Sequence, residues 1–147
     1  MTFKLTYSTM FDPPEEMHAR FEAALAELRA ELGATRAMHI DGADEAGRPV
    51  AEHRSPVDRR LVLGLSPRGE AADVERAVAA AKWAFPAWRA TPVAERLALV
   101  HRAAALIEER VYEISAVVSI EIGKNRMEAL GAVQETADLV AWYCEQM

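Results

Sequence analysis

Apolar positions near the start of the chain repeat at steps of three and four residues, the spacing of one face of an α-helix. The pattern predicts a leading helix over residues 12–33, with Asp12 as its N-cap, Pro13 at the first helical position and Gly33 as its stop. The apolar stripe of this helix consists of Met17, Phe21, Ala24, Leu25, Leu28 and Leu32. We expect that stripe to face other apolar parts of the protein.

Residues 37–66 have a different pattern, in which short apolar runs alternate with residues that form turns. The pattern predicts two or three short strands, with at least one antiparallel pair. The runs are Met38–Ile40, Val50–His53 and Leu61–Leu65, separated by Asp41-Gly42, Gly47-Arg48-Pro49 and Ser55-Pro56.

Helical spacing returns over residues 70–147 and predicts several consecutive helices. The first of them should end at Pro86, because a proline inside a helix removes a backbone donor. The next should start at Thr91 and Pro92, and a further one should close at Gly123 in the left-handed conformation. The apolar stripe of the first helix consists of Val74, Ala77, Val78, Ala81 and Phe85.

The last helix has apolar residues around most of its circumference. Asn125 followed three residues later by Glu128 predicts a capping box at its start. One stripe holds Leu130, Val133, Ala137, Val140, Ala141 and Cys144, whereas Leu139, Trp142, Tyr143 and Met147 lie on another side. A helix of this kind is normally buried from more than one direction. We therefore expect the segment Met127–Met147 to bind a further protein surface, unless the strands and the leading helix cover it.

Composition is that of a globular protein: 147 residues, of which 51% are hydrophobic and 27% charged, predict a single domain over 1–147. The net charge of −6 argues against nucleic acid as a partner. Cys144 is the only cysteine, and no apolar run is long enough to span a membrane. Because Met1–Leu5 is followed by polar residues, it does not have the pattern of a signal peptide. We expect a cytoplasmic protein with no membrane partner.

Several segments resemble, in order, parts of the aldehyde dehydrogenase superfamily. They are Met38–Gly42, Arg54-Ser55-Pro56, Ala77–Ala81 with Ala84, Phe85 and Trp88, Glu95-Arg96, and Glu121–Lys124. Within the superfamily, Gly123–Ala129 and Val133–Asp138 are similar to the 1-pyrroline-5-carboxylate dehydrogenases, and the leading helix fits them too. The resemblance implies a mixed α/β fold: several helices packed on a small antiparallel strand element, forming an incomplete amino-terminal portion of a dehydrogenase subunit.

The resemblance also implies the chemistry of the complete enzyme, the oxidation of L-glutamate γ-semialdehyde to glutamate with NAD in proline and arginine breakdown. In the family a cysteine nucleophile and a glutamate base lie downstream of the Gly123-Lys124 motif. We therefore assign no catalytic or cofactor-binding residue to this chain and expect it to be inactive alone. By residue order, Glu135 aligns with a glutamate near the aldehyde pocket, which makes it a substrate-pocket candidate in a complete subunit.

Other reactive side chains favour structural roles. Cys144 lies on an apolar helical stripe, which is typical of a packing residue rather than a nucleophile. Lys124 lacks the flanking residues of a phosphate loop, and no two of the seven glycines are spaced as in a dinucleotide-binding turn. The four histidines, His18, His39, His53 and His101, show no ligand spacing, so we predict no metal site.

Two hypotheses of function follow. In the first, the chain is the amino-terminal part of a dehydrogenase, and its last helix binds the remainder of the subunit or a complementary chain. In the second, it is a stand-alone helical protein-interaction module that keeps the family scaffold.

Overall fold

The computed structural model describes residues 11–147, and the prediction made for Met1–Leu5 lies outside them. The described residues form five helices and two antiparallel hairpins, which confirms the mixed α/β class. None of these helices is both long and apolar enough to cross a membrane. In chain order the elements are α1 (Glu15–Ala30), β1 (Met38–Ile40), β2 (Ala43–Glu45), β3 (Val50–Arg54), β4 (Val62–Pro67), α2 (Ala71–Ala90), α3 (Val93–Glu109), α4 (Val111–Ile122) and α5 (Arg126–Glu145).

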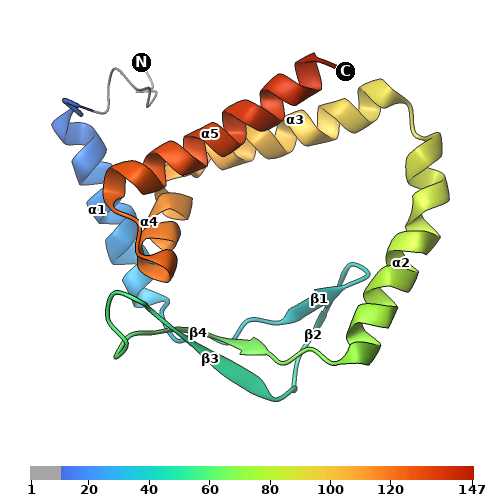
Figure 1. Cartoon of the computed structure of the whole chain (residues 1–147), viewed down its shortest axis with the longest axis horizontal. Helices are drawn as coiled ribbons and strands as arrows, with labels where there is room; N and C mark the ends of the chain where they lie inside the picture. Colours follow the sequence, from blue (N-terminus) through green and yellow to red (C-terminus); the bar gives the residue numbers. More distant parts are fainter. Residues whose placement is uncertain (1–10) are drawn as a thin grey trace.

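The helices and hairpins lie along the sides of a roughly four-sided outline (Figure 1). Helices α3 and α5 run side by side along one edge, and α1 and α4 pack together at one end. Helix α2 forms the opposite end and leads from the hairpins to α3. The hairpins form the remaining side, and α2 lies far from α1 and α4.

The hydrophobic core lies where α1, α4 and α5 meet. Met17 and Phe21 from α1 and Leu130 from α5 are each at most 3% exposed. Burying a side chain of this size contributes about 1.5 to 3 kcal/mol. The partly buried residues packed against this cluster are Leu25, Val111, Tyr112 and Met127. The predicted apolar stripe of the leading helix is therefore confirmed as its packing face.

The two hairpins differ in how they are fixed. In β1–β2, Ile40 pairs with Ala43 across a tight turn. Sequence reasoning missed β2 because Ala43–Glu45 has no apolar run. The β3–β4 hairpin is tied to α4 by Ser55, which is 1% exposed and donates from Oγ to the carbonyl oxygen of Ile120 at 2.7 Å.

The junction between α4 and α5 forms as predicted. Gly123 has φ +79° and ends α4 in the left-handed conformation, which costs glycine little because it lacks a Cβ. Asn125 caps α5: its Oδ1 accepts from the backbone N–H of Glu128 at 3.0 Å, and the Glu128 carboxylate accepts from the backbone N–H of Asn125. This capping box confirms the predicted start of the last helix.

The predicted ends of the leading helix are wrong by two or three residues. The helix begins at Glu15 with Pro14 as N-cap, rather than after Asp12, and it ends at Ala30. Because the residue before a proline is kept out of the helical region, Pro14 prevents Pro13 from starting the helix. Gly33, with φ +83°, lies in the turn that follows.

The predicted stop at Pro86 is also wrong. Helix α2 continues through Pro86 to Ala90, because a proline removes one backbone donor while the surrounding helical bonds remain. The helix ends where the chain reaches Pro92: Thr91, the residue before it, has ψ 131°, which is extended backbone. The predicted boundary at Thr91 and Pro92 is thus confirmed.

Candidate functional site

Helix α5 has one buried face and one exposed face. The buried face consists of residues that are 7% exposed or less, among them Leu130, Val133, Ala137 and Cys144. On the opposite side, the side chains of Leu139, Trp142 and Tyr143 are 47%, 51% and 61% exposed. The two aromatic rings contact each other edge to face, with centroids 5.0 Å apart. The division into two sides agrees with the sequence prediction, and α3 and α4 cover only the first.

Glu135, the predicted pocket candidate, lies on the exposed face of α5. It precedes Leu139 by four residues and Trp142 by seven, so the three side chains share one side of the helix. Among residues 11–147, Glu135 has no hydrogen bond or ion pair. Its neighbour Gln134 is instead 6% exposed and donates from Nε2 to Asp138. Glu135 is therefore a carboxylate beside an uncovered apolar surface.

Helix α2 carries a second uncovered apolar surface. Its predicted stripe forms a continuous side of the helix, but no other described element covers it. Val74, Val78 and Phe85 are 65%, 47% and 55% exposed, and Trp88 on the same side is 43% exposed, with the guanidinium of Arg96 on α3 lying 5.9 Å from its ring centroid. Asp73 is the only buried residue of the helix. We call Val74, Val78, Phe85 and Trp88 the α2 stripe.

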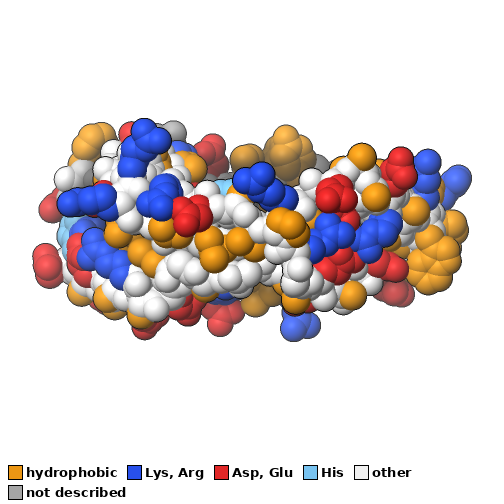
Figure 2. Space-filling view, turned by 90° about the horizontal axis from the view of Figure 1, so that it is seen from below, with side chains coloured by type: hydrophobic (Ala, Val, Ile, Leu, Met, Phe, Trp, Pro, Cys, Tyr) orange, Lys and Arg blue, Asp and Glu red, His pale blue; other side chains and the backbone are white. Residues whose placement is uncertain are grey.

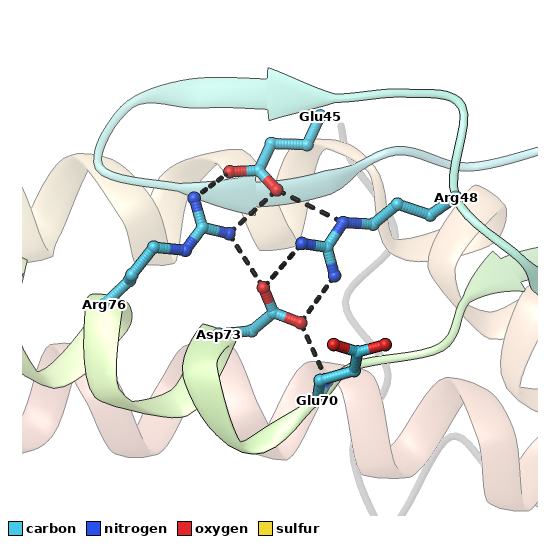
Figure 3. Close-up of polar contacts among 5 residues, drawn as sticks. All are labelled: Glu45, Arg48, Glu70, Asp73 and Arg76. Carbon is cyan, nitrogen blue, oxygen red and sulfur yellow. Dashed lines mark hydrogen bonds and ion pairs between the residues drawn. The ribbon is translucent and has the colours of Figure 1, made fainter.

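The first turns of α2 meet the β1–β2 hairpin and the loop between β2 and β3 through four charged residues, which we call the ion cluster (Figure 3). Arg48 makes a bidentate pair with Asp73, with Nη–Oδ distances of 2.5 and 2.8 Å. Arg76 donates to both oxygens of Glu45, at 2.5 and 2.9 Å, and also to Asp73 at 2.8 Å. Figure 2, seen from below, shows side chains of both charge signs crowded toward the right end of this face.

Electrostatics in the ion cluster favour the charged forms. The pKa of Asp73 lies far below its ordinary value, first because of Arg48 and then because of the backbone N–H of Glu70 and the guanidinium of Arg76. The pKa of Glu45 is also lowered, chiefly by its hydrogen bonds from Arg76. All four side chains therefore remain ionised at neutral pH, and the cluster has no net charge.

Beside the ion cluster lies an open hollow of about 640 Å³. Arg76 reaches it but is already paired with two carboxylates, so the hollow offers no unpaired cation to an anionic ligand. The residues that line it are Ile40, Asp41, Ala43, Glu45, Arg76, Ala79, Ala80 and Trp83. The arrangement supports a structural role for the cluster rather than a binding role.

The remaining reactive side chains are not brought together. Cys144 is 7% exposed and packs on the buried face of α5, as predicted. Lys124 lies exposed between α4 and α5, which confirms its predicted place at a helix terminus. The four histidines lie on α1, β1, β3 and α3. Residues 11–147 contain no group of three His, Cys, Asp or Glu side chains arranged to hold a metal ion.

Sequence reasoning missed the ion cluster, although the sequence held a signal for it. Glu45 and Arg48, and likewise Asp73 and Arg76, are opposite charges three residues apart. Within a helix that spacing predicts a local pair, as in Asp73–Arg76. The cross-pairs, which span 25 and 31 residues, depend on how the hairpin lies on α2 and are not encoded in any local spacing.

Comparison with known proteins relates the chain to a family of enzymes. The aldehyde dehydrogenase family matches residues 43–147. A 1-pyrroline-5-carboxylate dehydrogenase of Bacillus pumilus is 33% identical over 133 residues, which cover 90% of this chain and 26% of that protein. An N-succinylglutamate 5-semialdehyde dehydrogenase of Klebsiella pneumoniae is 42% identical over 108 residues, 71% of this chain and 21% of that protein.

A solved structure shares the fold. The 1-pyrroline-5-carboxylate dehydrogenase from Thermus with bound NAD superposes with a TM-score of 0.87 at 28% identity, over 99% of this chain and 28% of that one. The chain thus spans about a quarter of the length of the relatives that it matches.

Proposed function

The chain belongs to the aldehyde dehydrogenase family, and from this premise we propose that its residues form the amino-terminal scaffold of an NAD-dependent L-glutamate γ-semialdehyde dehydrogenase subunit. The similarity to 1-pyrroline-5-carboxylate dehydrogenases over 90% of the chain supports the substrate class. In this proposal the nucleophile, the base and the NAD site belong to other residues of the subunit.

One observation carries the proposal: two helices expose apolar side chains that the other described elements do not cover. Leaving three or four large apolar side chains in water forfeits several kcal/mol of burial energy, which is comparable with the stability of a small domain. The same fold occurs in relatives about four times as long, which have further protein available to cover α2 and α5.

Within such a subunit, Glu135 is the residue of this chain that we assign to the aldehyde pocket. Its carboxylate is exposed, unpaired among residues 11–147 and adjacent to Leu139 and Trp142 on α5. A covering protein that buries those two side chains would enclose Glu135 as well. The enclosed carboxylate could then accept a hydrogen bond from the substrate or orient a water molecule beside it.

The first experiment tests the activity of the chain alone and together with the complementary part of a relative. The purified chain with NAD and glutamate semialdehyde should produce no NADH. Adding the complementary part of the Bacillus pumilus relative, without its matched residues, should give a complex that produces NADH. Turnover by the isolated chain that persists in Cys144→Ala would contradict the proposal, since no other thiol is present.

The second experiment tests Glu135 in that complex. Glu135→Gln should raise KM for the semialdehyde or lower kcat by about tenfold, the effect of losing one hydrogen bond to a charged group. Glu145→Gln, an exposed glutamate at the end of the same helix, is the matched control and should leave both constants unchanged.

The exposed face of α5 also suits the alternative function, a stand-alone interaction module. This alternative predicts a monodisperse monomer that unfolds cooperatively and has no affinity for the complementary part of a dehydrogenase. Size-exclusion chromatography and a binding titration with that part distinguish the two functions.

A further inference from the structure

We propose that the ion cluster of Glu45, Arg48, Asp73 and Arg76 is an ionic clamp that sets the direction of α2 and so presents the α2 stripe to the protein that covers it. The identity of that protein, the rest of a dehydrogenase subunit, rests on the proposed function. The clamp itself rests on the geometry of α2 and the β1–β2 hairpin.

Helix α2 has few apolar anchors. Nineteen of its twenty residues are partly or fully exposed, and Asp73 is the exception at 5%. Among the described elements, its main neighbour is β1 of the hairpin. Beyond the cluster, the α2 residues Ala79, Ala80 and Trp83 border the hollow beside the hairpin, and the guanidinium of Arg96 on α3 lies 5.9 Å from the centroid of the Trp88 ring. The hydrogen-bonded contacts that can set the direction of α2 are those of its first turns.

The ion cluster constrains the direction of the groups that it joins. A bidentate guanidinium–carboxylate pair fixes the plane and the approach of both groups, and Arg48–Asp73 and Arg76–Glu45 are both of this kind. Asp73 also accepts from the backbone N–H of Glu70 at 2.7 Å, which fixes its carboxylate at the start of the helix. The two pairs thus hold α2 at one angle to the hairpin, through Glu45, and to the loop that follows it, through Arg48 (Figure 3).

The clamp and the α2 stripe lie on opposite sides of α2. Arg76, Ala80 and Trp83 line the hollow beside the hairpin, so this side of the helix faces β1–β2. Val74, Val78 and Phe85 follow at four- and seven-residue steps on the opposite side. Fixing the first side therefore fixes where the α2 stripe points. The fold match over 99% of the chain with a solved subunit several times longer supplies a protein large enough to cover that stripe.

Amide hydrogen exchange on the full 147-residue chain tests the clamp directly. Arg48→Met removes the guanidinium that pairs with Asp73 from the loop after β2, but leaves the bond from the Glu70 N–H to Asp73 intact. We expect exchange in residues 38–48 and in the first half of α2 to become about tenfold faster, with α1 and α5 unchanged. Asp73→Asn should give the same pattern. Exchange rates in Arg48→Met equal to those of the unmodified chain would overturn the clamp.

Matched variants separate the clamp from other roles of the same residues. Glu75→Gln removes an exposed carboxylate from the same helix that has no ion pair among residues 11–147, and should change nothing. If Asp73→Asn accelerates exchange but Arg48→Met does not, Asp73 acts only as a helix cap and the clamp is wrong. Acceleration in both variants supports it.

Association with the complementary part of the dehydrogenase tests the second half of the proposal. Arg48→Met should slow association severalfold, because α2 is less often in the direction that exposes its stripe to the partner. An unchanged association rate, together with faster exchange, would show that the clamp does not serve docking. If the unmodified chain does not associate at all, the proposed function fails, while the exchange measurement still decides whether the clamp exists.

Discussion

The two ends of the molecule are held by different forces. At one end, α1, α4 and α5 enclose Met17, Phe21 and Leu130, and the interaction there is mainly apolar burial. At the other end, α2 meets the β1–β2 hairpin through the ion cluster and leaves its apolar stripe in water. A single chain therefore has one end that is complete in itself and one end whose apolar surface is unused.

This difference shows that an apolar stripe with helical spacing can be either buried or exposed in the folded chain. The stripes of α1 and α2 have the same helical spacing, yet the first is buried and the second is exposed. Apolar burial near a core has no strict directional requirement, whereas crossed ion pairs have one. The ionic end is the one suited to holding an apolar surface at a fixed angle without covering it.

The largest expected difference between the two ends is in the stability that Phe21→Ala and Phe85→Ala each remove. Phe21 is 3% exposed, so its truncation should lower the free energy of unfolding by about 3 to 5 kcal/mol. Phe85 is 55% exposed, and its truncation should change that free energy by less than about 0.5 kcal/mol. Urea unfolding followed by circular dichroism measures both. Equal losses for the two variants would show that α2 is covered in solution.

A smaller loss of stability is expected when the cap at the start of α5 is removed. Asn125→Ala removes the acceptor for the Glu128 N–H and should lower the free energy of unfolding by about 1 kcal/mol. Asn125→Asp keeps an acceptor at the N-cap and serves as the control. The same unfolding measurement applies, and a loss as large in the Asp variant would contradict the capping role.

The last expected effect concerns protonation of the ion cluster, which changes nothing near neutral pH and becomes visible only in acid. Asp73 and Glu45 have folded-state pKa values below their ordinary values of 3.8 and 4.5. Their contribution is therefore fully present above the ordinary values, and it is lost as the pH falls toward the lowered ones. Exchange in residues 38–48 should be unaffected by cluster protonation between pH 7 and 5, after correction for intrinsic rates, and should accelerate below pH 4. In Asp73→Asn this acid step should shrink.

The sequence predicted those elements whose signals are local. The capping box at Asn125, the left-handed close at Gly123 and the apolar stripe of α1 each depend on residues within a few positions of one another. The errors at Asp12 and Pro86 are local too: the first arose from neglecting how Pro14 restricts Pro13, and the second from taking a proline inside a helix as its end.

What the sequence could not reveal depends on three-dimensional placement. The apolar stripe of α2 gives no sign of whether another element of this chain covers it. The cross-pairs of the ion cluster join α2 to the hairpin and to the loop after it, and neither spacing nor composition relates these residues. For Glu135, the residue order gave a candidate, and the structure places it on the exposed face of α5 with Leu139 and Trp142, but its role in a pocket stays a prediction.

The bond from Ser55 to the Ile120 carbonyl joins positions 65 residues apart. Closing so long a loop before it is held by other contacts is entropically unfavourable, so this bond should form late during folding, after α4 has docked. A contact absent from the transition state governs how fast the native protein opens rather than how fast it forms. The Ser55 hydroxyl would then slow unfolding and lengthen the lifetime of the folded chain, while leaving the refolding rate nearly unchanged.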